Sequence, residues 1–157
     1  MASTSSRNKA TPSTSLLRII AAITLLLLAA QFLIGMTVNL FVVVPSAHPG
    51  AYPSNYFVGV VQGVIWALGH GPQWLLFHVI VGLLLFLGSL ILIVLAIAAR
   101  RRAWIITTIL GLIGIMGAGF NGASFMNFGG QGFSSMLMAV GFLLAAISYA
   151  VGFYVTR

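Results

Sequence analysis

One apolar stretch of the chain decides what it can fold into. It reads HGPQWLLFHVIVGLLLFLGSLILIVLAIAARRR and carries no charged residue before the three arginines at its end. A helix needs roughly 20 apolar residues to cross a hydrocarbon core of about 30 Å. We therefore predict a transmembrane helix over residues 73–99. Lys and Arg gather on the cytoplasmic side of spanning helices, so Arg100–Arg102 predict that this end faces the cytoplasm.

Composition places the whole chain in a membrane and removes several kinds of chemistry. Charged residues make up 4% of the 157 residues, against about 25% in soluble domains. The chain has no Asp, Glu or Cys. This absence excludes carboxylate acid–base pairs, Ser-His-Asp triads, calcium or magnesium sites made of carboxylates, and disulfides. Whether the protein is an enzyme stays uncertain at this point, and a non-enzymatic role is favoured.

Three more long apolar runs predict three more spans. The fold class is thus an all-α membrane bundle of four helices, and a shorter apolar run lies between spans 1 and 2. That run has about twelve residues, too few to cross, so we predict an outer interfacial or re-entrant helix. The polar tail before the first span predicts a disordered cytoplasmic segment. The predicted ranges are 1–15 for the tail, 16–157 for the single membrane domain, 17–43, 73–99, 103–124 and 133–155 for the spans, and 57–68 for the outer helix.

The basic residues predict the topology. Six of the seven flank spans and Arg157 closes the chain; the six are Arg7, Lys9, Arg18, Arg100, Arg101 and Arg102. The segments 45–72 and 122–133 carry none. We therefore predict a multi-pass protein of the plasma membrane with both termini in the cytoplasm. The formal charge of +7 is attributed to this topology and to anionic lipid headgroups, and no nucleic-acid partner is predicted.

Small residues recur along the third span at spacings of three and four. Such spacing lets membrane helices approach closely. The residues are Gly111, Gly114, Gly117 and Ala118. They predict a tight seam inside one subunit; the alternative is a homo-oligomer interface or contact with another membrane subunit.

Neutral polar residues concentrate toward the predicted outer side. Amides there can form a small-molecule or cofactor pocket between helices. The residues proposed for this outer polar pocket are Asn39, Gln62, Gln73, Asn121 and Asn127. The alternative is that they cap helices and join them by hydrogen bonds, each contributing about 0.6 kcal/mol in membrane proteins.

Three histidines are the candidate cofactor ligands: His48, His70 and His78. His78 lies inside a span, where ionisable groups are rare and face protein or water. It is a candidate axial ligand for a b-type haem, with His70 or His48 as the second ligand. On one straight helix His70 and His78 would be about 12 Å apart along the axis, so they cannot clamp one iron unless the chain breaks between them.

Two other uses of His78 are open. It can act as a proton or quinone-headgroup partner, or as a structural hydrogen-bonding group between helices. Zinc is disfavoured because histidine spacings of 22 and 8 residues match no compact ligand pattern.

The segments HPGAYPSNYF, WALGHG and GFNGASFMNF together resemble a group of small four-span bacterial integral membrane proteins. The resemblance implies the four-helix architecture and no activity. Three function hypotheses follow. The first is a non-enzymatic membrane protein or accessory subunit, the second an outer-leaflet electron-transfer protein binding haem or quinone near His78, and the third a permease or channel for a small neutral solute.

Overall fold

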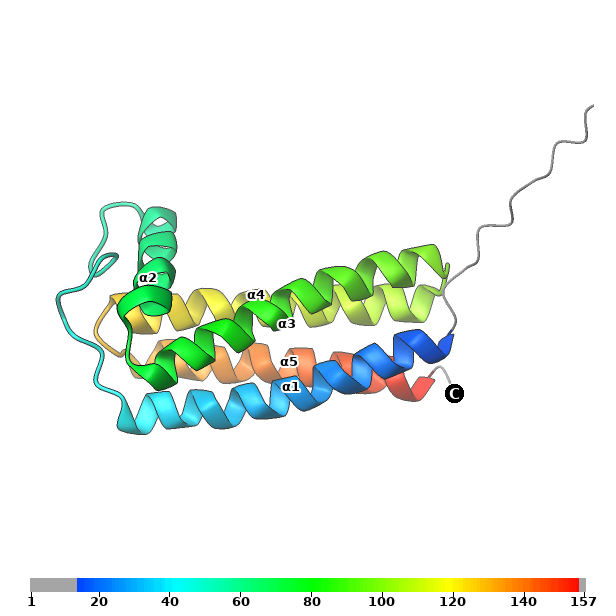
Figure 1. Ribbon diagram of the computed structural model, residues 1–157. Coiled ribbons are helices and arrows are strands. Elements are labelled where there is room, and N and C mark those ends of the chain that lie inside the picture. The colour runs from blue at the N-terminus through cyan, green and yellow to red at the C-terminus, as the bar shows by residue number, and fades with distance from the viewer. Residues whose placement is uncertain (1–13, 156–157) are drawn as a thin grey trace, which may run out of the picture.

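The computed structural model describes residues 14–155, and every regular element in this range is an α-helix (Figure 1). Four of the helices are long and apolar enough to cross a membrane. The predicted fold class is therefore confirmed, including the short helix between spans 1 and 2. The elements are α1 (Thr14–Phe41), α2 (Tyr56–His70), α3 (Gln73–Ala98), α4 (Arg102–Asn127) and α5 (Gly132–Val155).

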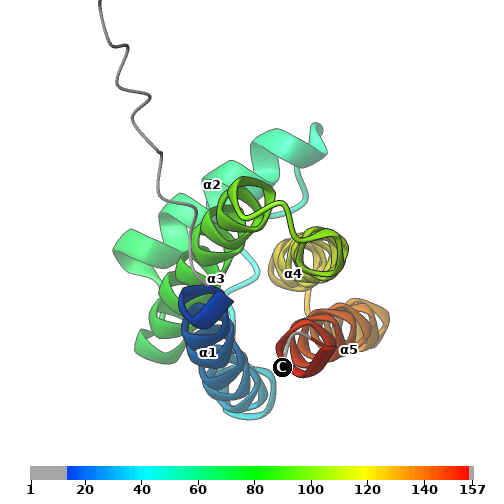
Figure 2. The ribbon, with the colours of Figure 1, turned by 90° about the vertical axis from the view of Figure 1, so that its right-hand side faces the viewer.

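The four long helices run side by side and enclose a common core. Seen along the bundle, they form a ring in which α1 lies next to α3 and α5, and α4 lies next to α3 and α5 (Figure 2). Both ends of the described chain lie at one end of the bundle, together with the connection that contains Arg100–Arg102 (Figure 1). We call this the basic end. Helix α2 lies across the opposite end and packs on α3 and α4.

Helix boundaries differ from the predicted ones by one to three residues, most at the start of α1 and the end of α4. Helix α1 begins at Thr14, inside the predicted tail, and the other tail residues 1–13 lie outside the described part. Helix α4 continues to Asn127, three residues beyond the predicted end at residue 124. The turn is short because Gly129 and Gly130 have φ of 75° and 76°, a backbone region that glycine adopts without steric cost.

The closest helix packing is between α4 and α5, and small residues make it possible. A Cβ built on Gly114 would lie 2.6 Å from the carbonyl oxygen of Gly141, and a Cβ on Gly141 would lie 2.6 Å from that of Gly114. A Cβ on Gly111 would clash with the Tyr149 ring. Gly117 has no heavy atom within 4 Å of its built Cβ. Most of the small-residue stripe is therefore used inside one chain, and Gly117 is its open member.

The core between the helices is apolar with a few hydroxyl groups. Trp104 and Tyr149 are its largest fully buried side chains. The Tyr149 hydroxyl donates to Ser89 Oγ at 3.0 Å, and Ser89 donates to the carbonyl of Leu85. Outside, large apolar side chains cover the long helices; Leu26, for instance, is 73% exposed. An apolar surface of this kind requires the bilayer as its solvent, which makes this a multi-pass membrane protein.

Candidate functional site

The candidate site is the outer cap, which we define as residues 42–72: the loop after α1, helix α2, and the break before α3. Asn55 starts α2 because its Oδ1 accepts a hydrogen bond from the amide of Val58 at 3.1 Å. In the loop, Gly50 has φ of 95° and packs against α2 so closely that a Cβ would lie 2.7 Å from the amide nitrogen of Gly63. The loop and α2 are therefore folded onto each other.

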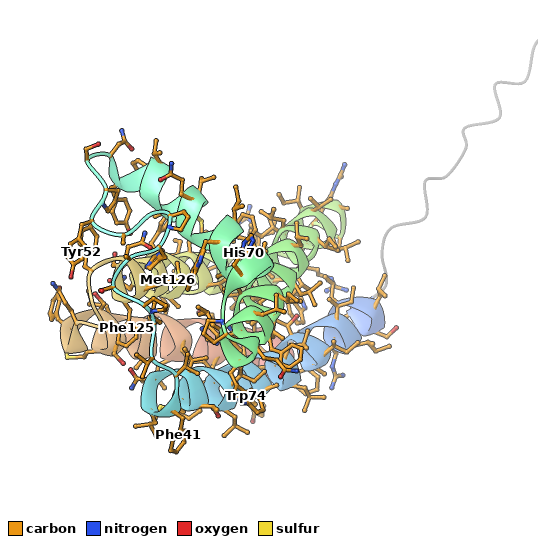
Figure 3. The ribbon with its side chains drawn as sticks, turned by 60° about the vertical axis from the view of Figure 1, so that its left-hand side comes forward. Phe41, Tyr52, His70, Trp74, Phe125 and Met126 are labelled. Carbon is orange, nitrogen blue, oxygen red and sulfur yellow. The ribbon has the colours of Figure 1, made fainter. Side chains whose placement is uncertain are left out.

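Hydrogen bonds fasten the outer cap to the end of α4. The Tyr56 hydroxyl donates to the carbonyl of Phe120 at 2.9 Å and lies 3.0 Å from Ser124 Oγ. The amide of Tyr52 donates to the carbonyl of Asn127 at 3.0 Å. Figure 3 shows Tyr52 at the same end of the molecule as Phe125 of α4. These bonds join segments far apart in the sequence, so the position of the cap is set by tertiary structure.

His48 also contributes to the contacts between the outer cap and α4. Its ring stacks on Trp66 with centroids 4.5 Å apart and an interplanar angle of 23°. Its Nε2 lies 3.2 Å from the carbonyl oxygen of Met126, and its Nδ1 lies 3.0 Å from that of Pro49. A neutral imidazole has one N–H, so at most one of these contacts is a hydrogen bond in the neutral form and both are in the charged form. In this arrangement each ring nitrogen faces a backbone carbonyl oxygen.

Helix α2 turns its small residues inward and its large ones outward. Gly59, Gly63 and Ala67 are buried and share one face. The opposite face is formed by large apolar side chains that are 37–66% exposed: Phe57, Val58, Val61, Ile65 and Leu68. We call these five residues the α2 outer face. An exposed apolar patch on a helix that is too short to span marks a surface meant for lipid or for another protein.

His78 lies at the seam between α1 and α3. The amide nitrogen of Gln31 donates to the carbonyl of His78 at 3.0 Å and lies 3.3 Å from its Nε2. A Cβ built on Gly35 would lie 2.8 Å from the imidazole, so glycine makes room for the ring. If Nε2 accepts from Gln31, the proton is on Nδ1. Within residues 14–155, His78 Nδ1 and Gln31 Oε1 are buried without a hydrogen-bond partner.

The other predicted site residues are spread over the outer end. Four of them are exposed: Asn39, Gln62, His70 and Gln73. Asn121 donates to Gly117 of its own helix at 2.8 Å. Asn127 is 1% exposed and its Oδ1 faces Gly63, where a Cβ would lie 2.6 Å away. Among the described residues no hydrogen bond joins any two members of the proposed pocket and histidine set.

The three histidines predicted as cofactor ligands are also far from one another in their surroundings. His48, His70 and His78 have different neighbours: the α4 end, the surface, and the α1–α3 seam. Within residues 14–155 there is no cluster of three His, Cys, Asp or Glu side chains that could hold a metal ion. A haem held by two of these histidines therefore has no observed geometry to support it.

Sequence reasoning missed two residues that organise this end. Gln31 appears in the sequence as one of several polar residues in the first span, and Tyr56 as an aromatic suited to the headgroup level. In the structure the Gln31 amide donates to the carbonyl of His78, and the Tyr56 hydroxyl donates to the carbonyl of Phe120 in α4. The available signal for the first was that Gln31 and His78 are hydrogen-bonding side chains inside two spans that are consecutive in the chain.

No protein-family model, curated protein or solved structure matches the chain. The resemblance to small four-span bacterial membrane proteins therefore stays a prediction, and function has to be argued from the molecule itself.

Proposed function

We propose that the protein is a small non-enzymatic membrane subunit that binds a partner protein through the α2 outer face. The observation that carries the proposal is the orientation of α2, which buries its small residues and exposes its large ones. Its small residues pack inward while Phe57 and Ile65, 66% and 63% exposed, point away from the bundle. Aromatic and large aliphatic side chains of this kind supply the central contacts of protein interfaces.

The cap supports this role because it is held in place before any partner arrives. Tyr56, Tyr52 and His48 each contact the α4 backbone. A surface that is already ordered loses little conformational entropy on binding.

The bundle interior does not favour the permease hypothesis. Buried hydroxyls in the core donate to carbonyls of their own helix: Thr24 to Ile20, Thr108 to Trp104, and Ser148 to Leu144. Groups used in this way do not line a path for a polar solute. Large apolar side chains such as Leu92 and Trp104 fill the space between them.

Electron transfer remains the second candidate because of the Gln31–His78 pair. A neutral His78 with its proton on Nδ1 offers a donor, and Gln31 Oε1 offers an acceptor. A quinone carbonyl and a quinol hydroxyl have the complementary chemistry. The test is organic extraction of the gently purified protein: a quinone retained by the native chain and lost in His78→Leu supports this candidate, and an extract without quinone removes it.

Site-specific photo-crosslinking in native membranes tests the partner proposal. A photoreactive phenylalanine analogue is placed at Phe57 or Ile65 of the α2 outer face. The matched controls are Leu26 and Ile147, which are 73% and 60% exposed on spanning helices. We expect a polypeptide adduct of one defined mass from both α2 positions and only lipid adducts from the controls.

Two outcomes would overturn the proposal. If the α2 positions give only lipid adducts, the α2 outer face contacts the bilayer and nothing else. If the controls give the same polypeptide adducts, the contact is collisional and not specific to the cap.

A further inference from the structure

The basic end of the bundle contains a cleft that the proposed function does not use. A cavity of about 550 Å³ opens between the start of α1, the start of α4 and the end of α5. Its walls include Thr14, Arg18, Arg101, Arg102 and Val155. Ligand pockets have volumes of roughly 300–1,000 Å³, so the cleft has room for a small polar group.

The charges in this cleft have no acidic side chain to neutralise them. Three arginines line it, and the chain contains no Asp or Glu to neutralise them. Arg101 makes one contact with Thr14, from Nη2 to Oγ1 at 3.4 Å, which leaves its other donors available within the described residues. Guanidinium groups present donors in a fork that matches phosphate oxygens. The chemistry of the cleft therefore calls for an anion.

The start of helix α4 adds to the positive electrostatic potential of the cleft. Helix α4 starts at Arg102, and the side chain of the N-cap residue Arg101 makes no capping hydrogen bond. Ala103, in the first turn, lines the cleft. The first amides of a helix lack partners inside the helix and carry partial positive charge, so they favour a negatively charged ligand. The arginine side chains and the first amides of α4 therefore both favour an anion in the same cleft.

An apolar cleft continues the basic one along the bundle. A second cavity of about 290 Å³ shares Ser15 and Arg18 with the first and is lined beyond them by Ile19, Ala22 and Phe153. The Arg18 guanidinium lies 4.8 Å from the centroid of the Phe153 ring, at the boundary between the two cavities. A charged cleft beside a shallow apolar hollow fits a molecule with a phosphate head and a hydrocarbon chain.

We infer that the basic end binds one anionic phospholipid, with its phosphate among Arg18, Arg101 and Arg102 and part of an acyl chain along Ile19, Ala22 and Phe153. The position favours a lipid over a free phosphate, because the cleft lies at the end of the spanning helices, at headgroup depth. Basic pockets between membrane helices are recognised binding places for anionic headgroups.

Native mass spectrometry of the full-length protein in a mild nonionic detergent tests this inference. The probes are phosphatidylglycerol, phosphatidylcholine and inorganic phosphate, each added alone. We expect a one-to-one phosphatidylglycerol adduct and much weaker retention of phosphatidylcholine. Arg101→Gln would remove a charge-assisted hydrogen bond to the lipid phosphate, so it should lower phosphatidylglycerol affinity by about tenfold or more.

The neighbouring arginine provides the matched control. Arg100 is exposed in the same connection but does not line the cleft. Arg100→Gln removes the same charge and should change affinity by less than about twofold, since only general attraction is lost. For the apolar part, Ala22→Phe fills the second cavity and should weaken the adduct, whereas Ala29→Phe on the exposed side of α1 should not.

Three results would overturn the inference. Equal losses in Arg100→Gln and Arg101→Gln would mean diffuse electrostatic attraction without a site. Inorganic phosphate that displaces the lipid at equal concentration would mean a free-anion site. Unchanged binding in Ala22→Phe would remove the acyl-chain part. A folded state for each variant is checked by circular dichroism, so that loss of binding is not confused with unfolding.

Discussion

Replacement of Gly114 by alanine tests the packing that holds α4 to α5. The new Cβ would lie 2.6 Å from the carbonyl oxygen of Gly141 and 2.7 Å from the amide nitrogen of Ala145. Ordinary contact begins at 3.4 Å, so the backbones would have to move apart by about 0.8 Å (3.4 minus 2.6) because neither backbone atom can rotate away. Overpacking of this kind costs about 1–3 kcal/mol.

Gly117→Ala is the matched control for helix propensity. It lies one turn further along the same helix, where a Cβ meets no heavy atom within 4 Å. Alanine is favoured over glycine inside a helix by about 1 kcal/mol, and both variants receive this gain. The difference between them therefore isolates the clash. We expect Gly114→Ala to be less stable than Gly117→Ala by about 2 kcal/mol, or roughly 30-fold in the unfolding equilibrium.

The assay is reversible unfolding of each variant in mixed micelles, with increasing sodium dodecyl sulfate and helix content followed by circular dichroism. The free energy of unfolding is obtained for the native chain and both variants. Equal stability of the two variants would refute the close α4–α5 approach. A Gly117→Ala variant that loses stability or changes its oligomeric mass would instead show that Gly117 packs against a second copy.

Three further predictions concern the hydrogen bonds of individual side chains. Tyr149→Phe should lower the free energy of unfolding by about 0.6 kcal/mol in the same assay because it removes the bond to Ser89; no change would mean that this bond is not formed. Tyr56→Phe should speed amide hydrogen exchange in residues 45–72 by about fivefold or more, since the bond to the Phe120 carbonyl and the contact with Ser124 Oγ are lost; exchange that accelerates equally in α5 would contradict a local role. Gln31→Leu should destabilise the bundle by about 1–3 kcal/mol because it leaves His78 Nε2 buried without its partner; the double variant with His78→Leu should recover part of that loss, and a double variant that is weaker still would disprove the coupling.

The spans were predictable from the sequence because the forces that set them are local. An uncharged run of sufficient length must cross or be buried, and Arg100–Arg102 must stay in water, so both ends of α3 follow from the residues themselves. The end of α4 was predicted too early. The predicted end at residue 124 rested on the four glycines of GASFMNFGGQGF (122–133). Of these, only Gly129 and Gly130 adopt the positive φ that ends the helix region.

The site was not predictable to the same degree, because it depends on contacts between distant residues. Tyr56 and Phe120 are 64 positions apart, and Gln31 and His78 are 47 apart. No periodicity in the sequence indicates such pairs. Polar character alone suggested that Asn39 and Gln62 line a pocket, but at the ends of membrane helices an amide is equally stable in the headgroup region, and both side chains are exposed.

The burial of the small face of α2 also depends on contacts between residues far apart in the sequence. Composition shows that residues 57–68 are apolar, but it does not say which face is buried. The face is decided by the close approach of Gly50 and Pro53 to Gly59, and of Asn127 to Gly63, where only a glycine fits. Small residues therefore point inward and the large ones are left outside.

The proposals for the two ends of the bundle require the outer cap to face the exterior and the basic end to face the cytoplasm. Because the chain has no cysteine, single cysteines can be introduced and labelled with a membrane-impermeant maleimide in intact cells. Ser46 and Arg100 are exposed at opposite ends, and Arg100→Cys leaves Arg101 and Arg102 in place. We predict that Ser46→Cys is labelled in intact cells and Arg100→Cys only after permeabilisation. Labelling of Arg100→Cys in intact cells, with Ser46→Cys protected, would contradict the account.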